Sequence, residues 1–172
     1  MSTFDSIIHR TRRRATDGLR SLADRTEPPR TQRELRAKVG GLWQQMGTHQ
    51  FDFLVERGLQ PSDHLLDVGC GVLRGGRHFV RYLDAGHYCG IDIADEMIVG
   101  AEQQLAEDGL TDKGARLRVT ETFDVDFGQP FDFAIAQSVF THLPMNSIWR
   151  ALANTSGQLA DRKSTRLNSS HT

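Results

Sequence analysis

The sequence contains few cysteines and no long apolar run, and each of these features excludes a class of protein. Its 172 residues include two cysteines, Cys70 and Cys89, too few for a disulfide framework and without the paired spacing of a zinc site. Seven histidines are scattered without metal-ligand spacing, so no metal is expected. No apolar stretch approaches the roughly 20 residues that span a bilayer, and the N-terminus has no secretory h-region. We therefore expect a cytoplasmic protein with no membrane part.

Basic and acidic residues are distributed unevenly along the chain. Residues 1–40 contain ten Lys or Arg against five Asp or Glu, and two prolines interrupt any helix that would run through them. We expect a basic arm, helical or partly disordered, that faces water or touches an anionic surface. The arm has no interleaved aromatic residues, so nucleic acid is not the expected partner. Residues 41–160 contain eight basic against sixteen acidic residues, which indicates one acidic domain.

The last segment, residues 161–172, does not continue the pattern of that domain. The stretch "DRKSTRLNSSHT" has one apolar residue and resembles the in-frame translation of a sequencing adapter. We expect this tail to be non-native, the alternative being a natural polar tail. The domain would then be truncated after its fourth strand, poorly stable and weak or inactive as this chain.

Short apolar runs alternate with helical patterns between residues 41 and 160. The runs "HLLDVG", "HYCGIDI", "ARLRVTE" and "FDFAIAQS" predict four buried strands. Helices are predicted over residues 31–39, after Gly41, through "RHFVRYL", through "ADEMIVGAEQQLAEDG" with Asp95 as N-cap, and after Pro144. Strands that alternate with helices in this way indicate an α/β fold with a doubly wound parallel sheet.

The stretch "LLDVGCGVLRGG" places glycines directly after the first predicted strand. Gly69 and Gly71 remove two Cβ atoms, so the chain can turn sharply and a ligand can approach its backbone. The N–H groups of the following helix favour a carboxylate or phosphate there, and Asp67 suits an ammonium group. The alternative is that the glycines merely turn the chain.

The end of the second strand adds a nucleoside-like feature. Asp92 stands twenty-one residues after Gly71, where an acidic side chain can accept hydrogen bonds from a ribose diol. Ile93 and Met97 could flank an adenine ring. A ligand with an amino acid at one end and a nucleoside at the other fits both strand ends, and S-adenosylmethionine (SAM) is such a ligand. The dinucleotide fingerprint is incomplete, because Arg74 stands where the third glycine of G-x-G-x-x-G would be.

The stretches "LLDVGCGVLRGG", "YCGIDIADEM" and "FDFAIAQSVFTHLP" together resemble three motifs of the class I SAM-dependent methyltransferases, in the same order and spacing. The resemblance implies a Rossmann-like fold of which this chain carries about four of seven strands. It also implies a methionine-facing group (Asp67, Gly69, Cys70, Gly71), the ribose contact of Asp92, an adenine-side pair (Thr122, Phe123) and a pair near the sulfonium (Gln137, Ser138). The family commonly has G-x-G-x-G, whereas position 73 is Leu here.

Several of these residues also have a purely structural interpretation. Cys70 is expected to be a small packing residue, and Phe123 could belong to the core instead of the ligand site. His142, just past the fourth strand, could act as a general base on the methyl acceptor, or could cap or pack the helix that follows Pro144.

The expected function is transfer of a methyl group from SAM to an O, N, C or S atom of an unknown acceptor, with a small molecule as the expected kind. Two alternatives remain open at this point. One is a non-catalytic module that binds SAM or a related nucleoside. The other is a different enzyme of the same fold, either an aminopropyl transferase or an NAD-dependent oxidoreductase.

Overall fold

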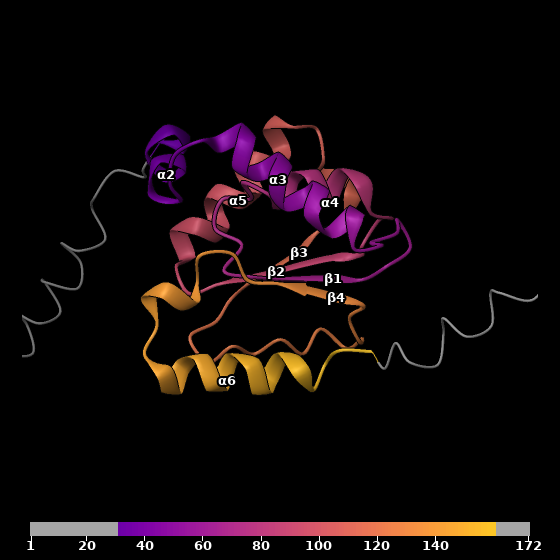
Figure 1. Ribbon diagram of the computed structural model, residues 1–172. Coiled ribbons are helices and arrows are strands. Elements are labelled where there is room, and N and C mark those ends of the chain that lie inside the picture. The colour runs from indigo at the N-terminus through magenta and orange to yellow at the C-terminus, as the bar shows by residue number, and fades with distance from the viewer. Residues whose placement is uncertain (1–30, 161–172) are drawn as a thin grey trace, which may run out of the picture. The chain divides into compact units, whose positions relative to one another are not determined.

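The computed structural model describes residues 31–160 (Figure 1). The predicted arm up to residue 30 and the predicted non-native tail at 161–172 lie outside the described residues. The helices are α2 (Gln32–Lys38), α3 (Trp43–Glu56), α4 (Gly76–Tyr82), α5 (Asp95–Glu107) and α6 (Met145–Ser156), with short 3-10 turns η1 (Thr111–Lys113) and η2 (Phe140–His142). The strands are β1 (Leu65–Val68), β2 (Tyr88–Asp92), β3 (Arg116–Val119) and β4 (Phe133–Ile135).

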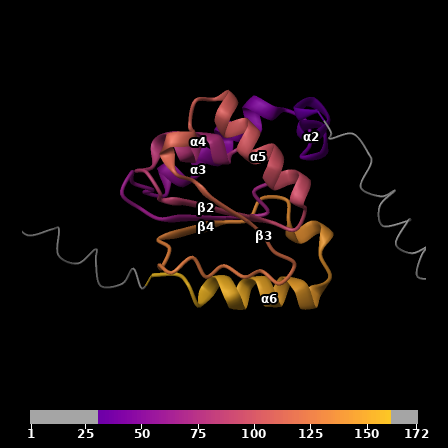
Figure 2. The ribbon, with the colours of Figure 1, turned by 180° about the vertical axis from the view of Figure 1, so that it is seen from behind.

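The four strands form one parallel sheet in the order β3-β2-β1-β4. Asp67 of β1 lies opposite Gly90 of β2 and Ile135 of β4. Helices α3, α4 and α5 cover one face of the sheet and α6 covers the other (Figures 1 and 2). The expected α/β, doubly wound, Rossmann-like architecture is therefore confirmed.

The core divides into two apolar clusters, one on each side of the sheet. Leu65 of β1 packs with Phe79 and Tyr88 in the cluster that includes the helices α3 to α5, while Leu66 belongs to the other cluster. Because consecutive side chains of β1 point to opposite faces and both faces are covered, the whole strand is buried. A short continuous apolar run is the sequence pattern that such a strand requires.

Helix α2 packs against α5. Leu35 is 3% exposed, and a Cβ atom on Gly100 would lie only 2.7 Å from its Cδ1 atom. Arg36 donates to Gln104 and forms a salt bridge of 2.6 Å with Glu107. The compact unit that holds the sheet accordingly begins at Gln32.

The start of α5 differs from the sequence prediction. Asp95 is not the N-cap but the first residue of the helix, and Ala94 takes the cap position without a side-chain hydrogen bond. The carboxylate that serves this turn is that of Asp92, whose Oδ1 accepts from the backbone N–H of Ala94 at 3.0 Å. Asp95 still contributes negative charge to the first turn, where it opposes the positive end of the helix dipole.

Candidate functional site

A cavity of about 710 Å³ opens at the carboxyl ends of the strands. Its wall includes residues at or just after the carboxyl ends of β1, β2, β3 and β4, and β1 is the strand at which the strand order changes direction across the sheet. Ligands of open α/β folds bind at this kind of position. Segments remote in sequence complete the wall, including residues of α3 and the connection between α2 and α3.

The glycine-rich loop after β1 needs its glycines for two reasons. Gly69 and Gly71 both have positive φ, of 73° and 52°, which residues with a Cβ atom rarely adopt. A Cβ atom on Gly69 would lie 2.3 Å from Cγ2 of Val139, and one on Gly71 would lie 2.8 Å from Cγ1 of Val39. From the sequence we expected the backbone at these two glycines to be open to a ligand. Instead, two valine side chains occupy part of the space beside them. These glycines therefore serve side-chain packing as well as the turn.

The backbone donors of this loop are already engaged. The N–H groups of Gly69 and Cys70 both donate to the Ile91 carbonyl, at 2.8 and 2.9 Å, and the N–H of Gly71 donates to Asp92. Helix α4 begins only at Gly76. The loop therefore offers a ligand fewer free N–H groups than the sequence pattern indicated.

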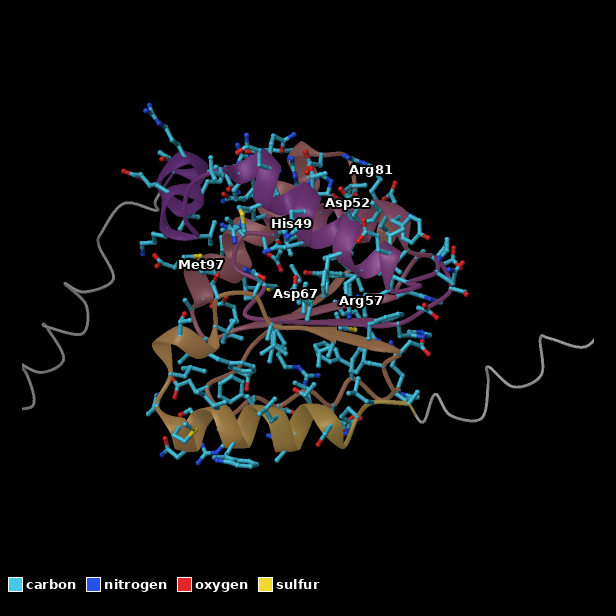
Figure 3. The ribbon with its side chains drawn as sticks, viewed as in Figure 1. His49, Asp52, Arg57, Asp67, Arg81 and Met97 are labelled. Carbon is cyan, nitrogen blue, oxygen red and sulfur yellow. The ribbon has the colours of Figure 1, made fainter. Side chains whose placement is uncertain are left out.

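Asp67 is a buried carboxylate at the end of β1. Asp67, which is labelled in Figure 3, is 7% exposed. Its Oδ2 accepts a hydrogen bond of 2.7 Å from the hydroxyl of Tyr88. Burial raises the pKa of Asp67 from 3.8 to about 6; the Tyr88 hydrogen bond opposes this rise and the charge of Asp92 adds to it. Within the described chain Oδ1 has no hydrogen-bond partner, so Asp67 keeps acceptor capacity for a donor in the cavity.

Asp92 joins the glycine-rich loop to the start of α5. Its Oδ2 accepts from the N–H of Gly71 and its Oδ1 from the N–H of Ala94, each at 3.0 Å. A carboxylate oxygen can accept more than one hydrogen bond, so both oxygens remain able to bind a ligand. Asp67 and Asp92 line the same cavity, with Gly69 also in its wall.

The structure brings together ten of the eleven predicted cofactor-binding residues: Asp67, Gly69, Cys70, Gly71, Asp92, Ile93, Met97, Phe123, Gln137 and Ser138. Thr122 is not in the wall, because its N–H turns back to the Thr120 hydroxyl and its carbonyl accepts from Asn154. Thr120, Glu121 and Phe123 line the cavity there instead. His142 ends η2, and because its side chain lies outside what the structure describes, its role as a base stays a prediction.

Other residues of the wall were not found from the sequence. They are Lys38, Val39, Gly40, Met46, Gln50, Arg74, Val139, Leu143 and Ser147, among others. Most come from segments that reach the cavity only through tertiary packing. Arg74 alone had a local signal, because it interrupts the glycine pattern of its loop.

Fold and site together define a Rossmann-like α/β protein with a ligand cavity at the carboxyl ends of β1, β2 and β4. Residues 66–162, more than half of the chain, match the family model described as "Methyltransferase domain". The chain belongs to this methyltransferase-domain family, which confirms the resemblance inferred from its motifs.

A curated relative and two solved structures extend the comparison. A probable fatty acid methyltransferase of Pseudomonas putida is 33% identical over 95 residues, which cover 55% of this chain and 24% of the relative. Magnesium protoporphyrin IX methyltransferase of Synechocystis, solved with bound S-adenosylhomocysteine (SAH), aligns with a TM-score of 0.57 at 18% identity, over 83% of this chain and 63% of its own. A SAM-dependent methyltransferase of Clostridium acetobutylicum aligns with a TM-score of 0.55 at 18% identity, over 85% and 54%.

The solved structures and the curated relative support different conclusions about this chain. At such low identity the two solved structures support the fold alone. The chain spans about a quarter of the length of the curated relative, and it covers little more than half of the Clostridium structure.

Within the described residues, no helix is long and apolar enough to cross a membrane. The same residues contain no group of three His, Cys, Asp or Glu side chains arranged to hold a metal ion. Cys70 and Cys89 are both buried and unbridged.

Proposed function

We propose that this protein transfers a methyl group from SAM to an acceptor molecule. The observation that carries the proposal is the shared cavity of Asp67 and Asp92, which lies beside the glycine-rich loop. Membership of the methyltransferase-domain family supports it independently. When bound, SAM would supply a sulfonium that makes its methyl group an activated electrophile.

The cavity residues fit the chemistry of that cofactor. Asp67 keeps a free acceptor oxygen for an ammonium group, and its pKa of about 6 leaves it mostly ionised at pH 7. Asp92 offers two oxygens for a diol. Ile93, Met97 and Phe123 supply apolar and aromatic surface for an adenine ring. The site therefore carries acceptors for the amine and the ribose, and an apolar surface for the base.

The protein would contribute to the reaction by aligning the methyl donor with the acceptor atom and by excluding water. An activated methyl donor needs an acceptor atom held in line with it, and alignment can supply much of the rate enhancement. The apolar side chains of Val39, Met46 and Leu143 also line the cavity and can displace water from it. His142 remains the candidate base for an acceptor that is protonated at working pH.

For the acceptor, a small molecule with an apolar part is the class that the cavity favours. A volume of about 710 Å³ lies within the range of small-molecule sites, and its wall contains Val39, Met46, Val139 and Leu143 beyond the predicted cofactor residues. The similarity to a protein described as a probable fatty acid methyltransferase points to the same class. Fatty acids are therefore the first acceptors to test.

Calorimetry with SAM, SAH and NAD tests the cofactor assignment, and transfer from methyl-labelled SAM to fatty acids and to a cell extract tests catalysis. We expect one SAH to bind per chain, no NAD to bind, and labelled product to form. Asp92→Asn should weaken SAH, while Asp112→Asn, a matched change at an exposed position in η1, should not. Absence of binding by SAM and SAH would refute the proposal, and binding without transfer to any fraction would favour a non-catalytic binding module.

A further inference from the structure

Tyr88 is a core residue with a polar group that apolar packing does not require. It begins β2, is 2% exposed, and belongs to the apolar cluster that also contains Leu65. In the strand register Tyr88 lies opposite Leu65. Since Leu65 and Asp67 are two residues apart, they point to the same face of β1, and the tyrosine ring reaches diagonally across the two strands to Asp67.

Gly76 provides the space for this hydroxyl group. A Cβ atom on Gly76 would lie 2.4 Å from the hydroxyl oxygen of Tyr88 and 2.6 Å from Cδ2 of Leu73. Gly76 begins α4 and does not have a positive φ, so its backbone conformation does not require a glycine. The second glycine of the stretch "LRGG" is therefore explained by the room that it leaves for these two side chains.

The hydroxyl donates to a carboxylate that has no other partner. Its hydrogen bond to Oδ2 of Asp67 is 2.7 Å long, and no other hydrogen bond or salt bridge from a described residue reaches this side chain. The titratable groups that face Asp67 or line the same cavity are Tyr88, Cys70, Asp92, Glu121, Lys38 and Arg74. Of the two cations, Lys38 pairs with Glu96 at 2.5 Å. Arg74 donates to the carbonyl oxygen of Val39.

The hydroxyl of Tyr88 favours the ionised form of Asp67. Burial raises the pKa of Asp67 to about 6; the hydrogen bond from Tyr88 opposes this rise, and the charge of Asp92 adds to it. Burial and the charge of Asp67 raise the pKa of Tyr88 well above its ordinary value, so the hydroxyl stays protonated at neutral pH and remains a donor. Because this donor occupies Oδ2, the acceptor oxygen that remains is Oδ1.

We propose that Tyr88 is a positioning residue of the cofactor site: its hydroxyl holds Oδ2 of Asp67 and leaves Oδ1 as the acceptor for the ammonium group of the amino-acid part. This role rests on the proposed function, because it takes SAM or SAH as the ligand. Tyr88 is not in the cavity wall, so it acts through Asp67. Gly76 contributes to the same arrangement, because it gives the hydroxyl its place.

Calorimetry with SAH between pH 5.5 and pH 8 tests this role. The ammonium group binds the ionised carboxylate, so the affinity of the wild-type protein should rise with pH and level off above about pH 7. Loss of a hydrogen bond to a charged group should move this rise upward by about one pH unit in Tyr88→Phe. The variant should therefore bind SAH about fivefold more weakly than the wild-type protein at pH 6, and less than about twofold more weakly at pH 8.

A second ligand and a matched variant separate this role from a structural one. Deaminated SAH keeps the adenosine and the carboxylate but has no ammonium group, so Tyr88→Phe should not weaken its binding at any pH. The matched control is Tyr82→Phe, which removes a hydrogen bond of 3.1 Å from a tyrosine hydroxyl of α4 to the Leu59 carbonyl. Tyr82→Phe should leave the pH profile of SAH binding unchanged.

Gly76→Ala perturbs the same contact from the opposite side, and it replaces Tyr88→Phe if that variant does not fold. Its Cβ atom would displace the hydroxyl oxygen, so the rise in SAH affinity should again move to higher pH. In the Tyr88→Phe background, Gly76→Ala should add no further movement, because no hydroxyl is left to displace.

Three results would overturn the inference. A pH profile of SAH binding that Tyr88→Phe does not move would show that the hydroxyl has no influence on the bound ammonium group. Equal weakening of SAH and deaminated SAH at every pH would assign Tyr88 to the core alone. The same upward movement in Tyr82→Phe would show that the loss of any core hydroxyl is sufficient. If the wild-type protein does not bind SAH at all, the proposed function fails, and this role fails with it.

Discussion

Replacing Asp67 with Asn should make the protein more stable at neutral pH and should weaken its binding of SAH. Burial raises the pKa of Asp67 from 3.8 in the unfolded chain to about 6 in the folded one. The folded protein therefore holds this proton more tightly than the unfolded chain does. Stability falls as the pH rises through the interval between the two values, because unfolding then releases a proton.

The magnitude follows from the two pKa values. Each tenfold change in acid strength is worth about 1.4 kcal/mol, so the ionised Asp67 costs the folded state about 3 kcal/mol at pH 7 and about half of that at pH 5. Asn has nearly the same shape, carries no charge, and its oxygen can still accept the Tyr88 hydrogen bond. The variant should thus be stabilised by up to about 3 kcal/mol at pH 7.5.

Urea unfolding of both proteins at pH 5 and pH 7.5 measures this difference, and calorimetry with SAH measures the cost to binding. The stability gain of Asp67→Asn should grow with pH, while SAH binding should weaken because the ammonium group loses its counter-charge. A variant that is less stable than the wild-type protein at pH 7.5, or a difference that does not change with pH, would refute the reasoning. Asp84→Asn, at an exposed position, is the control.

Three further predictions concern other parts of the molecule. Gly69→Ala should cost about 1–3 kcal/mol in urea unfolding, because φ is 73° and the new Cβ atom would meet Val139. Burial and the charge of His87 lower the pKa of His64, so the contribution of His64 to stability should fall as the pH drops below about 6.5; the difference in stability between His64→Gln and the wild-type protein should therefore shift in favour of the variant at lower pH. Burial raises the pKa of the Cys70 thiol, so mass spectrometry should find it unmodified by iodoacetamide at pH 8 until urea unfolds the protein.

Local sequence patterns were sufficient to predict the helices and strands and ten of the twenty-four residues that line the cavity. The apolar run before Gly69 predicted β1, and the spacing from Gly71 to Asp92 placed an acid at the end of β2. Both predictions depend on residues close to one another in sequence, or on strand ends that the parallel topology brings to one edge. The hydrogen bond from the N–H of Gly71 to Asp92 was not predicted, because the sequence pattern left that donor free for a ligand.

Much of the rest of the site depends on tertiary packing. Val39 and Gln50 come from segments with no motif, and they reach the cavity because α2 packs on α5 and α3 packs on α4. The partner of Asp67 was missed because Tyr88 begins the neighbouring strand and looks like an ordinary core aromatic in sequence. The misplacement of Thr122 arises in the loop after β3, where a side-chain turn at Thr120 decides which residues face inward.

The two backbone bonds to Asp92 have a consequence for recognition. Since main-chain N–H groups fix both oxygens without any ligand, their orientation is set before binding and costs no side-chain ordering. A glutamate at this position would carry the same charge, but its extra methylene would move the carboxylate away from the two backbone N–H groups that hold it. Selectivity for the sugar at this position would thus depend on the length of one side chain.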